Sequence, residues 1–259
     1  MTSSNDSPRR VGIFSDIHGN LHALDAVLQS LKEHDLERSI CLGDVVGYGP
    51  DPEACLDLIL ERDPVMVLGN HEEAVLDPAA ALGFREVARE AIDWTRRRLR
   101  ANRPDLLGRL SQIPGMAYIG SAVMCVHDSP IPGGARYLVD DARALPAFQG
   151  VDVPVCLIGH THLPAGFRLR DDAEGPWVET LRRAAIRTIR VDATQRWILN
   201  PGSVGQPRDG DPRASFAVLD LAEGVMSWER VGYDVDAAQS RALSSGLPAR
   251  TAERLALGA

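Results

Sequence analysis

The chain has 259 residues, of which 44% are hydrophobic, and this is enough apolar material for one α/β domain with a sizeable core. Its 28 basic and 36 acidic residues give a net charge of −8. This balance argues against broad binding to nucleic acids or to anionic membranes, because both need a basic surface. A phosphorylated substrate stays compatible with it, since bound divalent cations reverse the local field.

The first residues and the cysteines bear on the cellular compartment. Residues 1–8 are polar and predict a disordered leader, and no apolar run at this end indicates a secretory signal. The four cysteines are widely spaced, and none belongs to a C-x-x-C pair: Cys41, Cys55, Cys125 and Cys156. We therefore expect buried thiols in a reducing compartment, and a cytoplasmic protein without a membrane span.

Apolar, β-prone runs alternate with helical patterns in the first part of the chain. Strands are predicted over five runs: 10–15, 39–42, 64–68, 122–126 and 154–158. Helices are predicted over 21–31, where leucines recur at helical spacing, and over 52–62, which begins with a proline. Such a βαβαβ series is typical of an open parallel sheet, which binds ligands beyond the carboxyl ends of its strands.

The later segments predict helices first and antiparallel strands afterwards. Residues 72–112 follow a helical pattern, and a second amphipathic helical stretch runs from about 235, with a break at 246–248. Four short runs separated by polar turns predict a β-meander: 165–169, 177–181, 185–191 and 196–199. Residues 215–231 predict a closing hairpin around Gly224. No repeat or linker divides the chain, so we expect a single domain over 1–259.

Ligand-capable side chains follow five of the predicted strands. They are Asp16 and His18; Asp44; Asn70 and His71; His127; and His160 and His162. Each histidine taken alone is more often a packed or surface residue, but their recurrence at successive strand ends indicates one converging site. In the Asp-x-His and His-x-His pairs, the spacing of two residues predicts side chains on one side of an extended strand end. Imidazole, carboxylate and amide ligands without a thiolate suit Mn²⁺, Fe²⁺ or Zn²⁺, and their number implies two ions.

Two residues in glycine- and proline-rich loops are candidate substrate contacts. Tyr48 could stack on a substrate ring, and Arg208 ends the tightly specified loop 200–208. For both residues a structural role in the loop is an equally good interpretation.

The motifs D-x-H, G-D, G-N-H-E, a strand-end histidine and G-H-T-H, in this order, resemble those of the calcineurin-like metallophosphoesterase superfamily. The stretches S-D-I-H-G-N-L and N-P-G-S-V-G-Q-P-R are similar to a bacterial branch described as phosphodiesterases or diadenosine-tetraphosphatase-like enzymes. The resemblance implies a four-layer α/β/β/α sandwich of two mixed sheets. Residues 72–113 would then be a helical insertion over the site, and residues 235–259 a C-terminal helical tail.

Carried over residue by residue, the resemblance also implies roles for the strand-end residues. The assignment is Asp16, His18 and His162 for the first ion, Asn70, His127 and His160 for the second, and Asp44 as the bridge. His71 takes the place of the general acid or transition-state stabiliser. Asp128 departs from the glycine expected after the strand-end histidine, which affects either the surroundings of His127 or the space for substrate.

These assignments predict a hydrolase. Two divalent ions about 3.5–4 Å apart bridge and acidify a water, and the resulting hydroxide attacks phosphorus in line with the leaving oxygen. His71 as an imidazolium would protonate or stabilise that oxygen. We expect Mn²⁺, with Fe²⁺ or Zn²⁺ as alternatives, and a small phosphodiester or nucleotide substrate. A phosphomonoesterase or protein phosphatase, and a non-catalytic scaffold of the same fold, are the alternative functions, and the oligomeric state stays open.

Overall fold

The computed structural model describes residues 8–131, 133, 137–182 and 187–259, so the leader predicted over 1–8 lies almost wholly outside the described residues. The strands are β1 (Arg10–Phe14), β2 (Arg38–Cys41), β3 (Val65–Met66), β4 (Met116–Ile119), β5 (Val123–Val126), β6 (Val155–Leu157), β7 (Ala165–Asp172), β8 (Gly175–Arg182), β9 (Thr188–Arg190), β10 (Trp197–Asn200), β11 (Ala214–Asp220) and β12 (Val225–Val231). The helices are α1 (Leu21–Leu31), α2 (Pro52–Arg62), α3 (Asn70–Leu76), α4 (Glu86–Asn102), α5 (Pro104–Leu110), α6 (Asp141–Ala147), α7 (Val235–Ser244) and α8 (Ala249–Leu257), with 3₁₀ turns η1 (Pro78–Ala81) and η2 (Phe148–Gly150).

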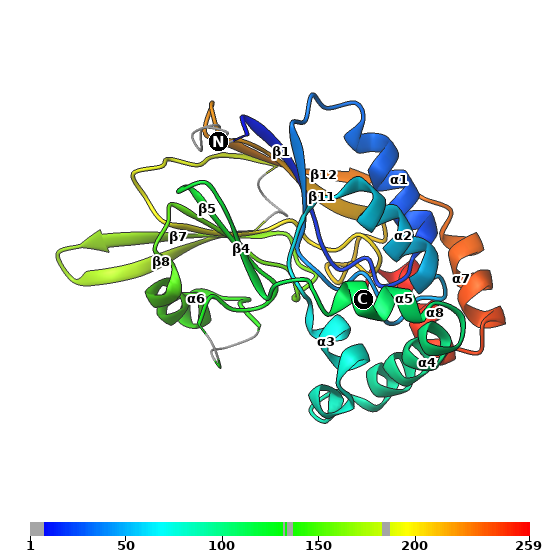
Figure 1. Ribbon diagram of the computed structural model, residues 1–259. Coiled ribbons are helices and arrows are strands. Elements are labelled where there is room, and N and C mark those ends of the chain that lie inside the picture. Colours follow the sequence, from blue (N-terminus) through cyan, green and yellow to red (C-terminus); the bar gives the residue numbers. More distant parts are fainter. Residues whose placement is uncertain (1–7, 132, 134–136, 183–186) are drawn as a thin grey trace, which may run out of the picture.

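The strands form two six-stranded sheets (Figure 1). The first has the order β3-β2-β1-β11-β12-β9 and the second the order β4-β5-β6-β10-β7-β8. Both sheets are mixed, since β1 is parallel to β2 and antiparallel to β11, and β10 is parallel to β6 and antiparallel to β7. The parallel strands β1, β2 and β3 are those of the predicted βαβαβ series.

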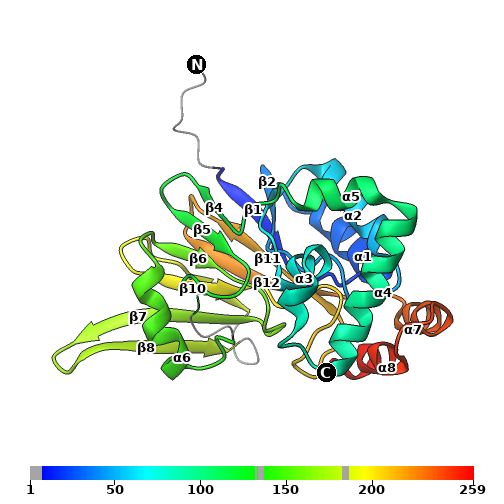
Figure 2. The ribbon, with the colours of Figure 1, turned by 60° about the horizontal axis from the view of Figure 1, so that its bottom comes forward.

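The two sheets pack face to face, and helices cover their outer faces (Figure 2). Residues from both sheets meet in the central apolar layer: Val11, Ile13, Ile40 and Leu42 from the first, and Val123, Leu157, Trp197 and Leu199 from the second. A second apolar cluster joins the outer face of the first sheet to α1, α2, α4 and α5, and a third joins the second sheet to α6. The structure confirms the four-layer α/β/β/α sandwich.

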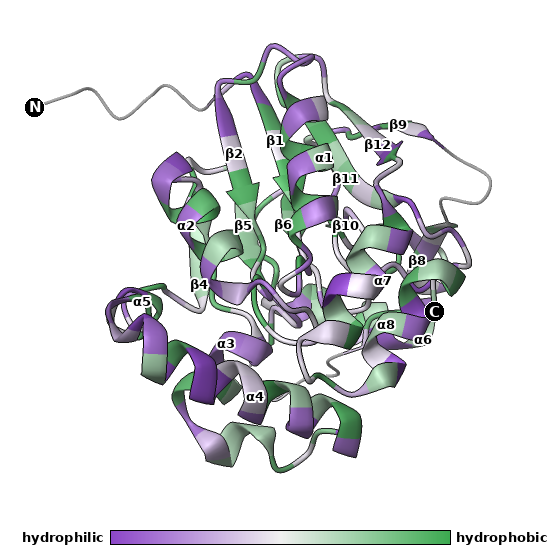
Figure 3. Cartoon of the chain, turned by 90° about the vertical axis from the view of Figure 1, so that its right-hand side faces the viewer, coloured by the Kyte–Doolittle hydropathy of each residue, from purple (hydrophilic) through white to green (hydrophobic). Residues whose placement is uncertain are grey.

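Local sequence accounts for the helices that lie beside the first sheet. The side chain of Asn20 accepts a hydrogen bond from the Ala23 amide and caps α1, as asparagine commonly does at this position. Pro52 begins α2, where its missing N–H costs nothing. In Figure 3, β1 and β2 change from hydrophilic at their amino ends to hydrophobic toward their carboxyl ends, where both are buried. The predicted bounds of α1 and α2 agree with the structure.

The β-meander predicted over 165–199 is wrong. Only β7 and β8 pair as a hairpin; β9 pairs with β12 in the first sheet, and β10 lies between β6 and β7 in the second. All four residues of β10 are buried, which is typical of a central strand. Local alternation predicts that a strand exists but not which strand pairs with it. Positions 185 and 186 of the predicted third run lie outside the described residues.

The helical pattern over 72–112 is divided into α3, η1, α4 and α5. Prolines at positions 78 and 104 each begin a new element, and Gly83 lies between η1 and α4. The indole Nε1 of Trp94 in α4 donates to the carbonyl of Ser245, between α7 and α8, at 3.1 Å. The helical segment 72–113 therefore contacts the C-terminal helical segment. The break predicted at 246–248 separates α7 from α8.

Two further expectations concern the cysteines and the membrane. All four cysteines are free and buried, as predicted for small hydrophobic core residues. Among the described residues, none of the helices has both the length and the apolar character to cross a bilayer.

Candidate metal centre

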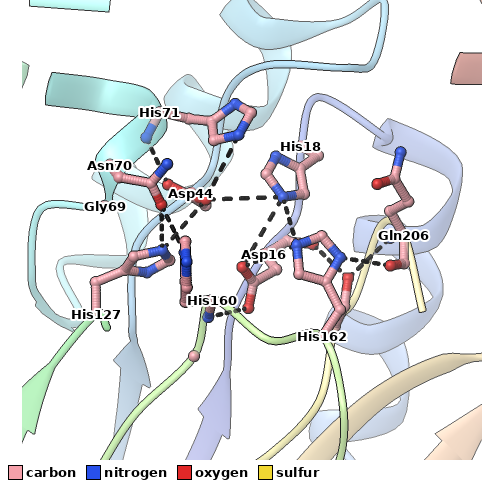
Figure 4. Close-up of polar contacts among 12 residues, drawn as sticks. Asp16, His18, Asp44, Gly69, Asn70, His71, His127, His160, His162 and Gln206 are labelled. Carbon is pink, nitrogen blue, oxygen red and sulfur yellow. Dashed lines mark hydrogen bonds and ion pairs between the residues drawn. The ribbon is translucent and has the colours of Figure 1, made fainter. Parts of the chain in front are cut away.

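The predicted ligand side chains meet at one end of the two packed sheets (Figure 4). All eight are buried: Asp16, His18, Asp44, Asn70, His71, His127, His160 and His162. The first five follow β1, β2 and β3 of the first sheet, and the last three follow β5 and β6 of the second. The convergence therefore joins the edges of two sheets, rather than the single parallel edge expected from the βαβαβ pattern.

The backbone at most of these ligands is left-handed. The φ angle is 56° at Asp16, 52° at His18, 54° at Asp44, 63° at His160 and 61° at His162. Positive φ is uncommon outside glycine, although Asp and His are enriched there, and such residues cluster at functional sites. The ligand pairs thus converge through turns beyond the strands, and our expectation that an extended strand end aligns them is wrong.

The first ligand group consists of Asp16, His18 and His162. Its two imidazole rings face each other with unprotonated nitrogens. Nδ1 of His18 lies 3.0 Å from the Val46 carbonyl oxygen, and Nδ1 of His162 lies 2.5 Å from that of Gln206. A carbonyl oxygen only accepts, so both Nδ1 atoms carry the proton and both Nε2 atoms present a lone pair. The two Nε2 atoms are 3.1 Å apart, and Oδ1 of Asp16 lies 3.3 Å from Nε2 of His162. This arrangement favours a cation between the three residues.

The second group spans the two sheets. Nδ1 of His127, after β5, donates to the carbonyl of Leu42, after β2, at 2.7 Å. Its Nε2 lies 3.0 Å from Oδ1 of Asn70 and 3.2 Å from Oδ2 of Asp44. Nδ1 of His160 lies 2.8 Å from the same Asn70 oxygen. Oδ2 of Asp44 is also 3.8 Å from Nε2 of His18, so this carboxylate faces both groups.

Unpartnered buried atoms provide the test of whether metal ions fit these residues. Oδ1 of Asp16 and Nε2 of His160 are buried and have no hydrogen-bond partner among the described residues. Buried polar atoms are almost always paired, and each exception needs an explanation. The side chains form three overlapping sets with ligand atoms within 4.8 Å of one another, and Asp44 belongs to two of them. Nitrogen and oxygen donors in this arrangement fit divalent transition-metal ions.

Burial and the close charges shift the pKa values of the site. Burial raises the pKa of Asp16 to about 7, against the opposing charge of His127. Burial would lower the pKa of His127, but the carboxylate of Asp44 outweighs it and raises that pKa to about 10. Burial lowers the pKa of His71 to about 4. These surroundings favour the neutral ring over the imidazolium expected from the sequence, and the role of His71 at the leaving oxygen stays a prediction.

His71 lies in the first turn of α3, beside the carboxylate of Asp44. Its backbone N–H donates to Oδ1 of Asp44 at 2.8 Å, and its Nε2 lies 4.0 Å from Oδ2. Gly47 packs against the ring so closely that a Cβ there would lie 2.1 Å from Nδ1. The backbone thus fixes both the position of the ring and its distance from Asp44.

A buried carboxylate that we had not assigned to the site holds the two loops of the first sheet together. Glu72 is fully buried and accepts hydrogen bonds from the backbone N–H groups of Asp44 at 2.7 Å, Val46 at 3.0 Å and Gly69 at 2.9 Å. These donors follow β2 and β3, so Glu72 positions the loop that carries Asp44. The G-N-H-E motif contains this residue, but nothing in the sequence indicates that its partners are backbone groups.

Comparison with known families identifies the fold and the chemistry. The model of the calcineurin-like phosphoesterase superfamily domain matches residues 10–224, a range that contains every residue of the two ligand groups. The chain belongs to the calcineurin-like phosphoesterase superfamily. Membership supports a phosphoesterase hydrolase that uses divalent metal ions, in agreement with the ligand sets.

Three relatives match almost the whole of this chain. An uncharacterised protein of Methanocaldococcus jannaschii is 34% identical over 253 residues, which cover 96% of this phosphoesterase and 98% of the relative. The crystal structure of a metallophosphoesterase from Sphaerobacter thermophilus is 34% identical, with a TM-score of 0.82 over 96% of this chain and 100% of that one. A hypothetical protein from Pyrococcus horikoshii, 19% identical, has a TM-score of 0.73 over 96% and 98% of the two chains, and shares the fold.

A cavity of about 670 Å³ opens beside the ligands of this phosphoesterase. Both predicted substrate contacts line it: Tyr48 has its ring 4.8 Å from that of His18, and the Arg208 guanidinium lies 5.9 Å from the Tyr48 ring. Phe84 of the insertion and Tyr137 also line it, next to His71 and His160 respectively. The volume is in the usual range for small-molecule sites.

The side chain of Asp128 contacts its own turn. Its Oδ1 accepts a hydrogen bond from the Ser129 backbone N–H at 2.6 Å, and Asp128 is not among the residues that line the cavity. This hydrogen bond belongs to the turn that follows His127.

Proposed function

We propose that this chain is a dinuclear metal-dependent phosphoesterase that hydrolyses phosphodiester or nucleotide substrates in the cytoplasm. The observation that carries the proposal is the pair of ligand groups that share Asp44. A scaffold protein of this fold would have no reason to retain buried, unpartnered ligand atoms, so these atoms argue against the non-catalytic alternative. The four buried thiols agree with a reducing compartment.

The contacts between the side chains support an assignment of the residues to two ions. Asp16, His18 and His162 would hold the first ion, and Asn70, His127 and His160 the second, with Asp44 between them. The ions, with Mn²⁺ as the expected metal, supply Lewis-acid activation of water and neutralisation of the phosphoryl oxygens. Asn70 contributes a neutral ligand, so the site keeps positive charge for the phosphate.

The protein itself positions the reacting groups. His71 is a neutral imidazole held beside Asp44, and it can donate an N–H hydrogen bond to the leaving oxygen. Such stabilisation or proton transfer is worth about 10²–10⁴-fold in rate. Backbone carbonyls orient the rings of His18, His127 and His162, as is usual for metal ligands.

The walls of the cavity favour a nucleotide-like substrate. Tyr137 is 52% exposed although its ring lies 4.5 Å from that of His160, and the ring of the partly buried Phe84 lies 5.3 Å from that of His71. Aromatic rings of this kind can stack on a base. A protein substrate would need a wider recognition surface, so we rank the protein phosphatase alternative below the diesterase.

The test is hydrolysis of a small panel after metal removal and reconstitution with Mn²⁺. The panel contains bis-p-nitrophenyl phosphate, p-nitrophenyl phosphate, a 2′,3′-cyclic nucleotide and diadenosine tetraphosphate, and the Asp44→Asn variant is the control. We expect metal-dependent turnover of a diester or nucleotide that the variant loses. Turnover of p-nitrophenyl phosphate alone would instead indicate a phosphomonoesterase. Absence of both turnover and bound metal would support the scaffold.

A further inference from the structure

Three arginines from distant parts of the chain line the cavity beside the metal centre. Arg85 precedes α4 of the insertion, Arg208 lies in the loop after β10, and Arg254 belongs to α8 of the C-terminal tail. The contact between Trp94 and Ser245 brings the insertion and the tail together at this place. The arginines therefore share one cavity because of the fold, although their numbers are far apart.

Within the described part of the chain, no aspartate or glutamate side chain lies at ion-pair distance from the three cavity arginines, although the protein carries a net charge of −8. Arg103, by contrast, pairs with Asp57 and Asp105, and Arg241 pairs with Asp51. Asp44 lines the same cavity but belongs to the ligand groups of the metal centre. The charges of the three arginines are therefore not neutralised by direct ion pairs with acidic side chains.

The polar contacts of the cluster leave most of its N–H groups available. Arg208 donates from Nη2 to Oε1 of Gln206 at 2.9 Å, and its buried Nε has no hydrogen-bond partner among the described residues. Arg254 donates from Nε to the carbonyl of Ala259 at 2.6 Å. A guanidinium carries five N–H donors in a planar fork that matches phosphate. Each arginine therefore keeps donors that a bound anion could use.

The repulsion between the positive charges of these arginines also favours the binding of an anion. Burial, followed by the charges of Arg208, Arg250 and Arg85, lowers the pKa of Arg254, with Tyr48 acting in the opposite direction. Like charges held together in a partly buried place are destabilising unless a counter-charge joins them. Arg208 also lies over the ring of Tyr48, which contacts His18, so the cluster continues directly from the metal centre.

We propose that Arg85, Arg208 and Arg254 form a second anion subsite, and that the substrate carries a second phosphate group besides the one that reacts at the metal centre. This inference rests on the proposed function and narrows its substrate class. The cavity of about 670 Å³ has room for much more than one phosphate. The second phosphate is either the neighbour of the reacting one in a phosphoanhydride or a group separated from it by a short spacer.

Non-hydrolysable phosphonates test the subsite by equilibrium binding. Titration calorimetry of the Mn²⁺-loaded protein, at a fixed concentration of free Mn²⁺, would compare three probes. Methylphosphonate has one anionic group, methylenediphosphonate has two adjacent groups, and 1,3-propylenediphosphonate has two separated groups. We expect at least tenfold tighter binding of one diphosphonate than of methylphosphonate, and the preferred diphosphonate tells which spacing the subsite accepts.

Single substitutions then assign the preference to the arginines. Arg85→Ala and Arg254→Ala should each reduce the preference for the diphosphonate by about fivefold to tenfold, close to 1–1.4 kcal/mol, and leave methylphosphonate binding within twofold. Arg89→Ala is the matched control, because Arg89 is exposed on α4, which Arg85 directly precedes, and does not line the cavity. Arg85 is exposed and its side chain has no polar contact with the described residues, so its substitution should not disturb folding.

Two results would overturn the subsite: a diphosphonate preference unchanged in both variants, or an equal loss of affinity for all three probes. Turnover of bis-p-nitrophenyl phosphate reports the proposed function separately, because this substrate has one phosphate. Turnover without an arginine-dependent preference would support the phosphoesterase function and contradict the anion subsite. An arginine-dependent preference without turnover of any panel member would support the anion subsite and contradict the proposed phosphoesterase function.

Discussion

Replacing Glu72 tests whether a buried carboxylate holds the bridging ligand in place. In Glu72→Ala the backbone N–H groups of Asp44, Val46 and Gly69 lose their common acceptor. In Glu72→Gln the amide oxygen can take the place of Oε2, which accepts from Asp44 and Gly69, but the amide nitrogen then faces the N–H of Val46. The alanine variant therefore loses three hydrogen bonds, and the glutamine variant loses one of them together with the negative charge.

The size of each effect follows from these counts. A hydrogen bond to a charged group contributes about 1.5–3 kcal/mol, and a buried donor left unpaired costs about 1–3 kcal/mol. The three bonds share one acceptor and do not add fully, so we expect Glu72→Ala to lower the free energy of unfolding by about 3–5 kcal/mol. For Glu72→Gln we expect about 1–3 kcal/mol. Because the whole free energy of unfolding of a domain is about 5–15 kcal/mol, the alanine variant should be marginally stable.

Denaturant unfolding of the metal-free protein measures this loss, and metal analysis after reconstitution measures its effect on the site. We expect Glu72→Gln to fold but to bind the ions more weakly, because the loop that carries Asp44 loses one anchor. Glu90→Gln is the control, since Glu90 is an exposed residue of α4. An alanine variant within 1 kcal/mol of the wild type would refute the anchoring role.

Three further predictions concern the site. In His71→Ala, kcat should fall by about 10²–10⁴-fold while metal content measured by plasma emission stays unchanged; loss of both metals would reject the assigned role. Gly47→Ala should displace the His71 ring, and, because φ is +86° at Gly47, cost about 1–2 kcal/mol of unfolding free energy, with full metal content; an unaltered kcat would contradict the packing argument. Metal loading near pH 7 should release protons, because the pKa of His127 is raised to about 10 and that of Asp16 to about 7 and both groups must lose their protons to bind a metal ion, so affinity should rise with pH; calorimetry in buffers of different ionisation enthalpy measures this release, and a proton count of zero would contradict it.

Local sequence patterns predicted where the helices and strands lie better than they predicted which strands pair with each other. Leucines at helical spacing gave α1, and the apolar runs before Asp16, Asp44 and Asn70 gave β1, β2 and β3. The strand β10 was predicted too, but its place in the centre of the second sheet was not, because pairing depends on residues that are distant in the chain. The arrangement in two sheets came from the resemblance to a family, not from periodicity.

The site shows the same division between residue type and conformation. Recurrent ligand types at strand ends identified the residues that the structure brings together. The left-handed backbone at Asp16 and His160 could not be predicted, because a single residue with positive φ outside glycine carries little sequence signal. Arg85 and Arg254 likewise have no distinguishing sequence signal, since an arginine on an amphipathic helix usually belongs to a solvated face. Only the fold places both in the cavity.

The site also joins the two sheets, and this couples its geometry to the core. The ring of His127 in the second sheet donates to the carbonyl of Leu42 in the first, and the backbone N–H of His160 donates to Oδ2 of Asp16 across the same boundary. Ser203, after β10, donates from its hydroxyl to the carbonyl of Asp16. A shift of one sheet relative to the other would therefore change ligand positions directly. Since packed interiors transmit volume changes instead of absorbing them, substitutions in the layer between the sheets should alter metal affinity without touching a ligand.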